Sequence, residues 1–170
     1  MSNTDTTLLI RNALIDNYNG YAEGLDSKNW PLVRACFADE VLIDYGDISA
    51  PTGAPEVPRR ADDWMKNLQA VINGFDITRH AITNHRFTIT DEQVSCRAYL
   101  RADHIIFANP AVPAIGPEEM VTVVGEYTNT YQQLDGVWKI CKSELRVDWS
   151  EGNISLLATA TERAPAYRGS

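Results

Sequence analysis

Hydrophobic spacing predicts two helices at the start of the chain. Apolar residues recur every three or four positions between a cap at Asn3 or Thr4 and about Leu25, which is the spacing of one helix face. Ser27 or Asn29 can cap a short second helix, with Trp30 or Pro31 in its first turn. The second helix is expected to carry four apolar residues: Leu32, Val33, Cys36 and Phe37.

The pattern changes twice before the middle of the chain. Residues 41–45 predict a first strand, and residues 46–58, with three prolines and two glycines, predict a loop. A third helix is expected over residues 61–72, because apolar side chains recur on one face and a glycine follows at position 74.

Strand patterns fill most of the remaining chain. Alternating or continuous apolar residues predict strands over 76–85, 86–90, 94–107, 121–134 and 137–149. Asp135-Gly136 is a strong hairpin signal between the last two strands. The proline-rich segment 108–119 is expected to be irregular, and the tail from Ser150 has one apolar patch, residues 154–157.

These elements predict a single α+β domain over residues 1–170, with a core of about 8–149 and a tail of 150–170. A curved mixed or antiparallel sheet would wrap around the three N-terminal helices, the only cover the pattern provides. The space between sheet and helices is the natural pocket, and segment 108–119 is a candidate lid.

Composition narrows the class of protein. The net charge of −8 and the lack of a basic cluster argue against a nucleic-acid partner. No apolar run approaches the roughly 18 residues of a membrane span, and the polar N-terminus does not resemble a secretory signal. Three widely separated cysteines suggest a reducing compartment, so we expect a cytoplasmic protein. No phosphate-binding loop or metal-ligand pattern is present, and we predict no cofactor and no metal.

The segment 76–85 contains two of the three histidines. His80 would share a strand face with Thr78 and Ile82, so its imidazole points where apolar groups point. A neutral imidazole can take a proton near pH 7, although a core histidine bonded to a carbonyl is the simple structural alternative. Regular alternation along 94–107 would point His104 inward and Asp103 outward, and a bulge would reverse this.

The order helix–helix–strand–helix–meander, with Trp138 just after the Asp-Gly turn, resembles the NTF2-like (cystatin-like) fold. Within it the chain is similar to the SnoaL-like group that contains scytalone dehydratase, bile-acid 7α-dehydratase and hexachlorocyclohexane dehydrochlorinase. The resemblance covers roughly residues 8–149, and it matches site positions to residues of this chain: Asp26 after the first helix, Tyr21 within that helix, His80 after the third helix, Asp103 on the long strand and, after a one-residue shift, Arg146 on the last strand.

The resemblance implies a cofactor-independent lyase that removes water or halide from a hydrophobic cyclic molecule. Asp26 would orient His80, and His80 would take a proton from carbon; without the resemblance, Asp26 would be interpreted as a helix cap. Tyr21 or Tyr45 could polarise a carbonyl, and Asp103 or His104 could protonate the departing oxygen. We also expect substrate contacts from a further set: Tyr45, Trp64, His104 and Arg146.

Two alternatives remain open on the same fold. One is an isomerase or cyclase like ketosteroid isomerase, which needs a carboxylate base with an acid opposite it. The other is a non-catalytic small subunit of a ring-hydroxylating dioxygenase, whose cavity would be filled by side chains. An open sheet leaves one face to cover, so we expect a homo-oligomer, either a trimer or a dimer.

Overall fold

The computed structural model describes residues 3–46, 57–112 and 114–164. Its helices are α1 (Asn3–Ser27), α2 (Trp30–Ala35), α3 (Ala61–Ile72) and α4 (Leu156–Arg163), with a short 3-10 helix, η2 (Pro117–Glu119). Its strands are β1 (Phe37–Asp44), β2 (Arg59–Arg60), β3 (Ile77–Ile89), β4 (Val94–Ile105), β5 (Met120–Leu134) and β6 (Val137–Gly152). Most of the predicted loop 46–58 lies outside the described residues.

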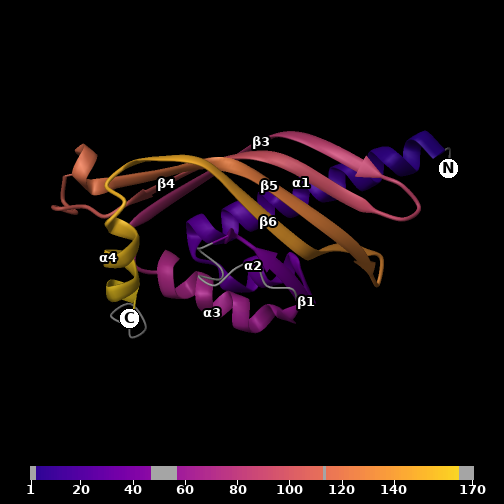
Figure 1. Cartoon of the computed structure of the whole chain (residues 1–170), viewed down its shortest axis with the longest axis horizontal. Coiled ribbons are helices and arrows are strands. Elements are labelled where there is room, and N and C mark those ends of the chain that lie inside the picture. Colours follow the sequence, from indigo (N-terminus) through magenta and orange to yellow (C-terminus); the bar gives the residue numbers. More distant parts are fainter. Residues whose placement is uncertain (1–2, 47–56, 113, 165–170) are drawn as a thin grey trace.

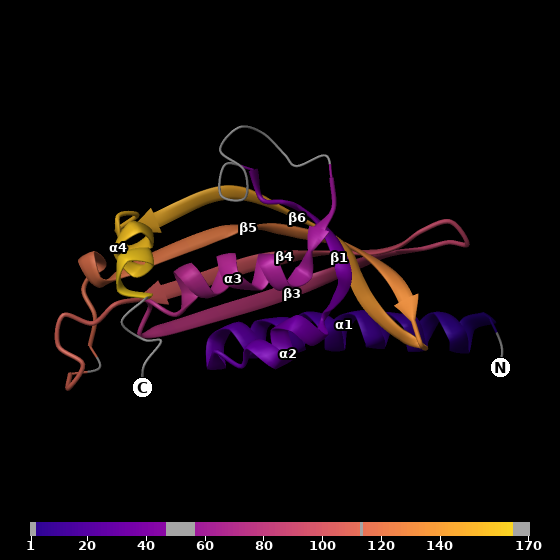
Figure 2. The ribbon, with the colours of Figure 1, turned by 90° about the horizontal axis from the view of Figure 1, so that it is seen from below.

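The strands form a mixed sheet in the order β2-β1-β6-β5-β4-β3. Strands β3 to β6 are an antiparallel meander, and β1 returns from the N-terminal half to pair in parallel with β6. The sheet arches over α1, α2 and α3, and α4 stands at one end of the arch (Figure 1). Seen from below, α3 crosses the concave side of the sheet while α1 and α2 run along its β3 side (Figure 2).

The curvature of the sheet depends on a register shift between β5 and β6. The pairing slips between Val124 and Gly125. A side chain at Gly125 could not be accommodated there, because its Cβ would lie 2.1 Å from the carbonyl oxygen of Arg146. A bulge of this kind bends the strand and increases its twist, which folds the sheet around the helices.

Alternation along the strands separates a buried concave face from an exposed convex face. In β4 the concave side carries Cys96, Ala98, Leu100, Ala102 and His104, all of them buried. The concave face packs on apolar side chains of α1 and α3 to form the main core, whose largest buried members include Leu14, Tyr18, Phe37 and Ile43.

Most predicted elements are confirmed, including the limits of α3 and the Asp135-Gly136 hairpin, where both residues have positive φ. Two expectations are wrong. Phe37 begins β1 instead of ending the second helix, because α2 stops at a cap on Cys36. The tail contains α4, so the early helices are not the only cover. None of the described residues of segment 108–119 lines the cavity between the sheet and the helices, and a role for that segment as a lid stays a prediction.

Candidate active site

The carboxylate of Asp26 binds both the ring and the backbone of His80. Asp26 lies in the last turn of α1, and His80 lies near the start of β3. Oδ1 of Asp26 is 2.7 Å from Nδ1 of His80, and Oδ2 accepts the backbone N–H of His80 at 3.0 Å. The hydroxyl of Thr78 also donates to Oδ1 at 2.9 Å. Three bonds from one strand therefore fix the carboxylate.

These bonds determine the charge of Asp26 and the tautomer of His80. Burial raises the pKa of Asp26, but the hydrogen bonds from His80 and Thr78 outweigh that effect and hold the pKa below its usual value. An ionised carboxylate only accepts hydrogen bonds, so Nδ1 of His80 must donate. In neutral His80 the other ring nitrogen, Nε2, is therefore the bare one, available to accept a proton.

His80 reaches a cavity between the sheet and the helices. Its side chain is only 4% exposed, and that of Asp26 is 16% exposed. His80 pairs in register with Ala102 of β4, whose small side chain leaves room beside the imidazole. Alternation predicted this placement correctly, since Thr78 and Ile82 point to the same side of β3.

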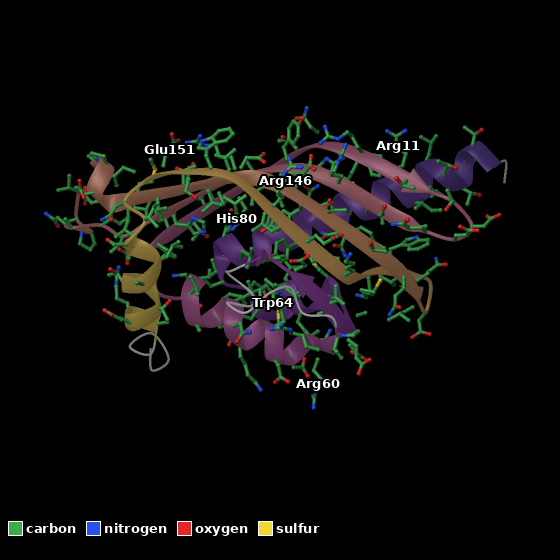
Figure 3. All side chains as sticks on the ribbon, viewed as in Figure 1. Arg11, Arg60, Trp64, His80, Arg146 and Glu151 are labelled. Carbon is green, nitrogen blue, oxygen red and sulfur yellow. The ribbon has the colours of Figure 1, made fainter. Side chains whose placement is uncertain are left out.

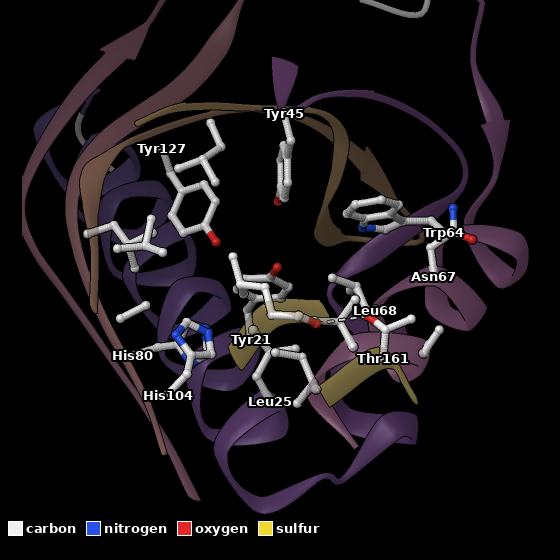
Figure 4. Close-up of a pocket in the computed structure, with 18 of the residues that line it drawn as sticks. Tyr21, Leu25, Tyr45, Trp64, Asn67, Leu68, His80, His104, Tyr127 and Thr161 are labelled. Atoms are coloured by element: carbon white, nitrogen blue, oxygen red, sulfur yellow. Dashed lines mark hydrogen bonds between the residues drawn. The ribbon is translucent and has the colours of Figure 1, made fainter. Parts of the chain in front are cut away.

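The cavity has a volume of about 510 Å³ and a predominantly apolar lining. Helices α1, α3 and α4 and the sheet all contribute to it (Figure 4). No Asp, Glu, Lys or Arg is among the described residues that line it. The polar lining groups are three tyrosines, two histidines, Trp64, Asn67 and Thr161. A pocket of this size and polarity suits a small neutral ligand.

Three tyrosine hydroxyls, from Tyr21, Tyr45 and Tyr127, converge in the cavity (Figure 4). The three rings pack on one another, with Tyr21 edge-on to Tyr127 at 6.0 Å and Tyr45 at 5.8 Å from Tyr127. Burial raises the pKa of Tyr21 and of Tyr127 well above the ordinary value for tyrosine. Both phenols therefore remain protonated and can donate a hydrogen bond to a ligand oxygen.

Tyr45 differs from the other two tyrosines because a buried chain of hydrogen bonds uses its hydrogen. Ser143 donates to Oδ1 of Asn129 at 2.7 Å, and its oxygen lies 3.0 Å from the hydroxyl of Tyr45. A serine hydroxyl has one hydrogen, so Tyr45 must be the donor in its bond with Ser143. The Tyr45 oxygen can then only accept hydrogen bonds, and the hydroxyls of Tyr21 and Tyr127 lie within hydrogen-bonding reach of it.

His104 lies beside His80 on the neighbouring strand. The two rings meet edge to face with their centroids 5.4 Å apart, and Phe75 packs on the other side of His104. Burial, and after it the charge of His80, lowers the pKa of His104 to about 4. His104 is thus a neutral imidazole near pH 7, and its buried Nδ1 has no hydrogen-bond partner in the described part of the chain.

Helix α4 closes one end of the cavity with Leu157, Ala158 and Thr161. Its backbone approaches the end of α3 closely: a Cβ on Gly74 would lie 1.8 Å from the carbonyl oxygen of Ala160. Arg163 at the end of α4 also pairs with Asp76 at 2.8 Å. A close backbone contact and an ion pair therefore hold α4 against the cavity.

Two predicted site residues lie on the opposite face of the sheet. Asp103 faces outward, where it accepts the Thr122 hydroxyl at 2.6 Å, and the β3–β4 and β4–β5 registers run without a shift past it. The bulge that could have turned it inward does not occur, so the expectation that Asp103 joins the pocket is wrong. Arg146 lies on the same outer face, paired with Asp148 at 2.9 Å, and the expected contact with a ligand in the cavity is also wrong (Figure 3).

The outer face carries its own polar network around Glu126. This nearly buried carboxylate lies 2.6 Å from Arg86, 3.5 Å from Arg97 and 3.8 Å from Arg146. Exposed aromatic side chains, Tyr99 at 46% and Trp149 at 55%, lie in the same shallow groove. Self-association through this face stays a prediction.

The structure adds site residues that the sequence analysis did not name. Tyr127 is the clearest, and its signal was available: it follows Val121 and Val123 on the alternating inward side of β5 and pairs with the small Ala98. No local sequence pattern indicated Asn129 and Ser143, because their contact with each other depends on the pairing of β5 with β6.

No group of three or more His, Cys, Asp or Glu side chains among the described residues could hold a metal ion. Among the described helices, none combines the length and the apolar character that crossing a bilayer requires.

The chain belongs to the SnoaL-like domain family, whose sequence model matches residues 6–144. It is 24% identical over 153 residues to the scytalone dehydratase arp1 of Aspergillus fumigatus, a match that covers 85% of this chain and 83% of that protein. The family and this relative support a lyase-type enzyme.

Solved structures agree on the fold. A hexachlorocyclohexane dehydrochlorinase of Novosphingobium barchaimii has a TM-score of 0.66 and 20% identity, and the match covers 90% of this chain and 95% of that one. A Nostoc punctiforme protein with a cystatin-like fold has a TM-score of 0.59 and 13% identity, over 81% and 90% of the two chains. The predicted α+β, NTF2-like (cystatin-like) fold and the SnoaL-like family are confirmed.

Proposed function

We propose that the protein is a cofactor-independent dehydratase or dehydrohalogenase that acts on a neutral, hydrophobic cyclic molecule. The observation that carries this proposal is the bond from Nδ1 of His80 to the Asp26 carboxylate, with Nε2 left bare at a predominantly apolar cavity. The family and the dehydratase relative support the same reaction class.

His80 acts as the base. Nε2 takes a proton from carbon, the C–H electrons form the double bond, and the bond to the hydroxyl or halide on the adjacent carbon breaks. The Asp26 carboxylate stabilises the imidazolium that forms. When hydroxide is the leaving group, the imidazolium returns the proton and water departs, so no other reagent is needed. A positioned proton transfer of this kind typically contributes about 10²–10⁴ in rate.

The tyrosines stabilise negative charge on the substrate. Tyr21 and Tyr127 keep their hydrogens and can donate to a carbonyl oxygen that gains charge as the proton leaves. Tyr45, whose hydrogen is given to Ser143, instead accepts from a hydroxyl of the substrate. Neutral His104 can contact the leaving group without adding a second positive charge beside His80.

The two alternatives have less support from the cavity. An isomerase or cyclase would need a carboxylate directed at the substrate, yet no carboxylate is among the described residues that line the cavity, and Asp26 is bonded to His80. An assembly subunit would have a filled interior, whereas this cavity has a volume of about 510 Å³.

A β-hydroxytetralone, which is a neutral bicyclic β-hydroxy ketone, tests the proposal. The wild-type protein should convert it to the naphthol by loss of water, which ultraviolet absorbance detects. His80→Ala should reduce the rate by at least about 10²-fold. His85→Ala is the matched control, because His85 lies on the same strand outside the cavity lining, and its rate should remain unchanged. An unaltered rate in His80→Ala would refute the proposal.

A further inference from the structure

Trp64 presents a buried hydrogen-bond donor that no described residue of the chain satisfies. It lies in the first turns of α3, is 3% exposed and lines the cavity. Its Nε1 is buried and has no hydrogen-bond partner among the described residues. The indole nitrogen can only donate, and buried polar groups in native proteins are almost always paired. The unpaired N–H therefore indicates a missing acceptor.

The indole ring is held in place by its neighbour. Tyr45 meets it edge-on, with the ring centroids 5.1 Å apart and the planes at 87°. The bond from Tyr45 to Ser143 in turn anchors the tyrosine. Trp64 thus cannot easily rotate to find a partner elsewhere, and its N–H direction is preorganised.

The position of Trp64 shows which part of a ligand it would meet. Trp64 lies across the cavity from His80 and His104, with the converging tyrosine hydroxyls between them (Figure 4). A ligand whose reacting carbon lies at Nε2 of His80 would extend its other end towards α3. The lining offers no charged side chain among the described residues, so an anionic end group would find no counter-charge.

We infer that Trp64 is a specificity-determining residue whose Nε1–H binds an acceptor oxygen at the end of the substrate remote from the eliminated group. The substrate class is a neutral, fused or linked ring system with oxygen atoms at two opposite ends. The oxygen at the Trp64 end is an ether, carbonyl or hydroxyl oxygen. The inference rests on the proposed function for the placement of the reacting end.

Two ligands that differ in one atom test the inference. The first is a naphthol with a methoxy group at the opposite end of the ring system, and the second carries an ethyl group there, which has the same shape but no acceptor. Calorimetric titration of the wild-type protein should give about threefold to tenfold tighter binding of the methoxy ligand, the value of one neutral hydrogen bond. In Trp64→Phe this preference should disappear, while the ethyl ligand still binds within about threefold of its wild-type affinity.

Two controls separate the possible causes. Trp30→Phe removes an indole N–H that bonds to Asn73 at 3.1 Å outside the cavity, and it should keep the methoxy preference. His80→Ala should lose elimination activity but keep the preference for the methoxy ligand. The binding test therefore remains valid even if the proposed elimination reaction is wrong.

Three outcomes would overturn the inference. One is a methoxy preference that persists in Trp64→Phe. Another is a wild-type protein with no preference, as when an ordered water satisfies the indole, or with no affinity for either naphthol. The third is an equal loss of affinity for both ligands in Trp64→Phe, which would mean that the ligands depend on the bulk of the indole ring and not on its N–H.

Discussion

The imidazole of His80 meets the imidazole of His104 edge to face, with 5.4 Å between ring centroids. The contact follows from strand register: His80 pairs with Ala102, and His104 lies two residues further along the same face of β4. Because burial and the nearby His80 lower the pKa of His104 to about 4, only one ring of the pair becomes charged when His80 takes a proton. Two adjacent histidines can thereby have different roles.

The lowered pKa of His104 predicts a loss of stability in mild acid. An unfolded histidine binds a proton below pH of about 6.5, whereas folded His104 does so only near its pKa of about 4. Between these values the unfolded state binds more protons, so the free energy of unfolding falls as pH falls, by up to about 3 kcal/mol. Urea unfolding across this range should show a clearly smaller pH dependence in His104→Gln.

A second histidine contributes in the same direction and provides the comparison. Burial also lowers the pKa of His85, and His85→Gln should remove a separate part of the pH dependence. Asp26 affects the free energy of unfolding at lower pH. Because its pKa is lowered in the folded protein, the stability it contributes is lost only when the pH falls below the usual carboxyl pKa. An unchanged slope in His104→Gln would contradict the assignment.

Asp26 should act through His80 and not through the substrate. Asp26→Asn removes the charge that stabilises the imidazolium and fixes its tautomer, so kcat should fall by about 10²–10⁴ while KM changes little. Asp103→Asn is the matched control, because Asp103 also accepts a threonine hydroxyl but on the outer face, and its kcat should equal that of the wild type. Steady-state kinetics of both variants distinguish action through His80 from action in substrate binding. A rise in KM alone for Asp26→Asn would place Asp26 in substrate binding.

Helix α4 should control how tightly the cavity holds its ligand. Gly74→Ala places a methyl group against the backbone of Ala160, which must move. We expect KM to rise by about tenfold, roughly the effect of losing 1.4 kcal/mol of binding, and proteolysis within residues 156–163 to accelerate. Gly20→Ala, whose new Cβ would make only ordinary contacts at 3.7 Å, should leave both unchanged. Equal KM values in the two variants would contradict a role for α4 in holding the ligand.

Periodicity predicted the elements whose pattern is local. The limits of α3 follow from its apolar spacing, and the β5–β6 hairpin follows from Asp135-Gly136, because those signals lie within a few residues. Helix α4 escaped prediction because its apolar face is short and is stabilised by contacts with Gly74 and Asp76, far away in sequence. Local spacing carries no information about such contacts.

The site was predictable where strand alternation and the family resemblance agreed. Both placed His80 inward, and the structure brings Asp26 to it. For Asp103 they disagreed, and alternation was right because β4 is regular at that point. Arg146 depended on a one-residue alignment shift, and a strand that slips by one residue turns each side chain to the other face. Tyr127 could have been found by applying alternation to β5.

The proposed elimination depends on one tautomer, in which Asp26 holds His80 with Nδ1 protonated and Nε2 bare towards the cavity. Long-range proton–nitrogen NMR correlation on protein with ¹⁵N-labelled histidine distinguishes the two ring nitrogens directly. At a pH where His80 is neutral, we predict that Nδ1 carries the hydrogen in the wild type and that Asp26→Asn loses this preference. Observation of the hydrogen on Nε2 of His80 in the wild type would contradict the account.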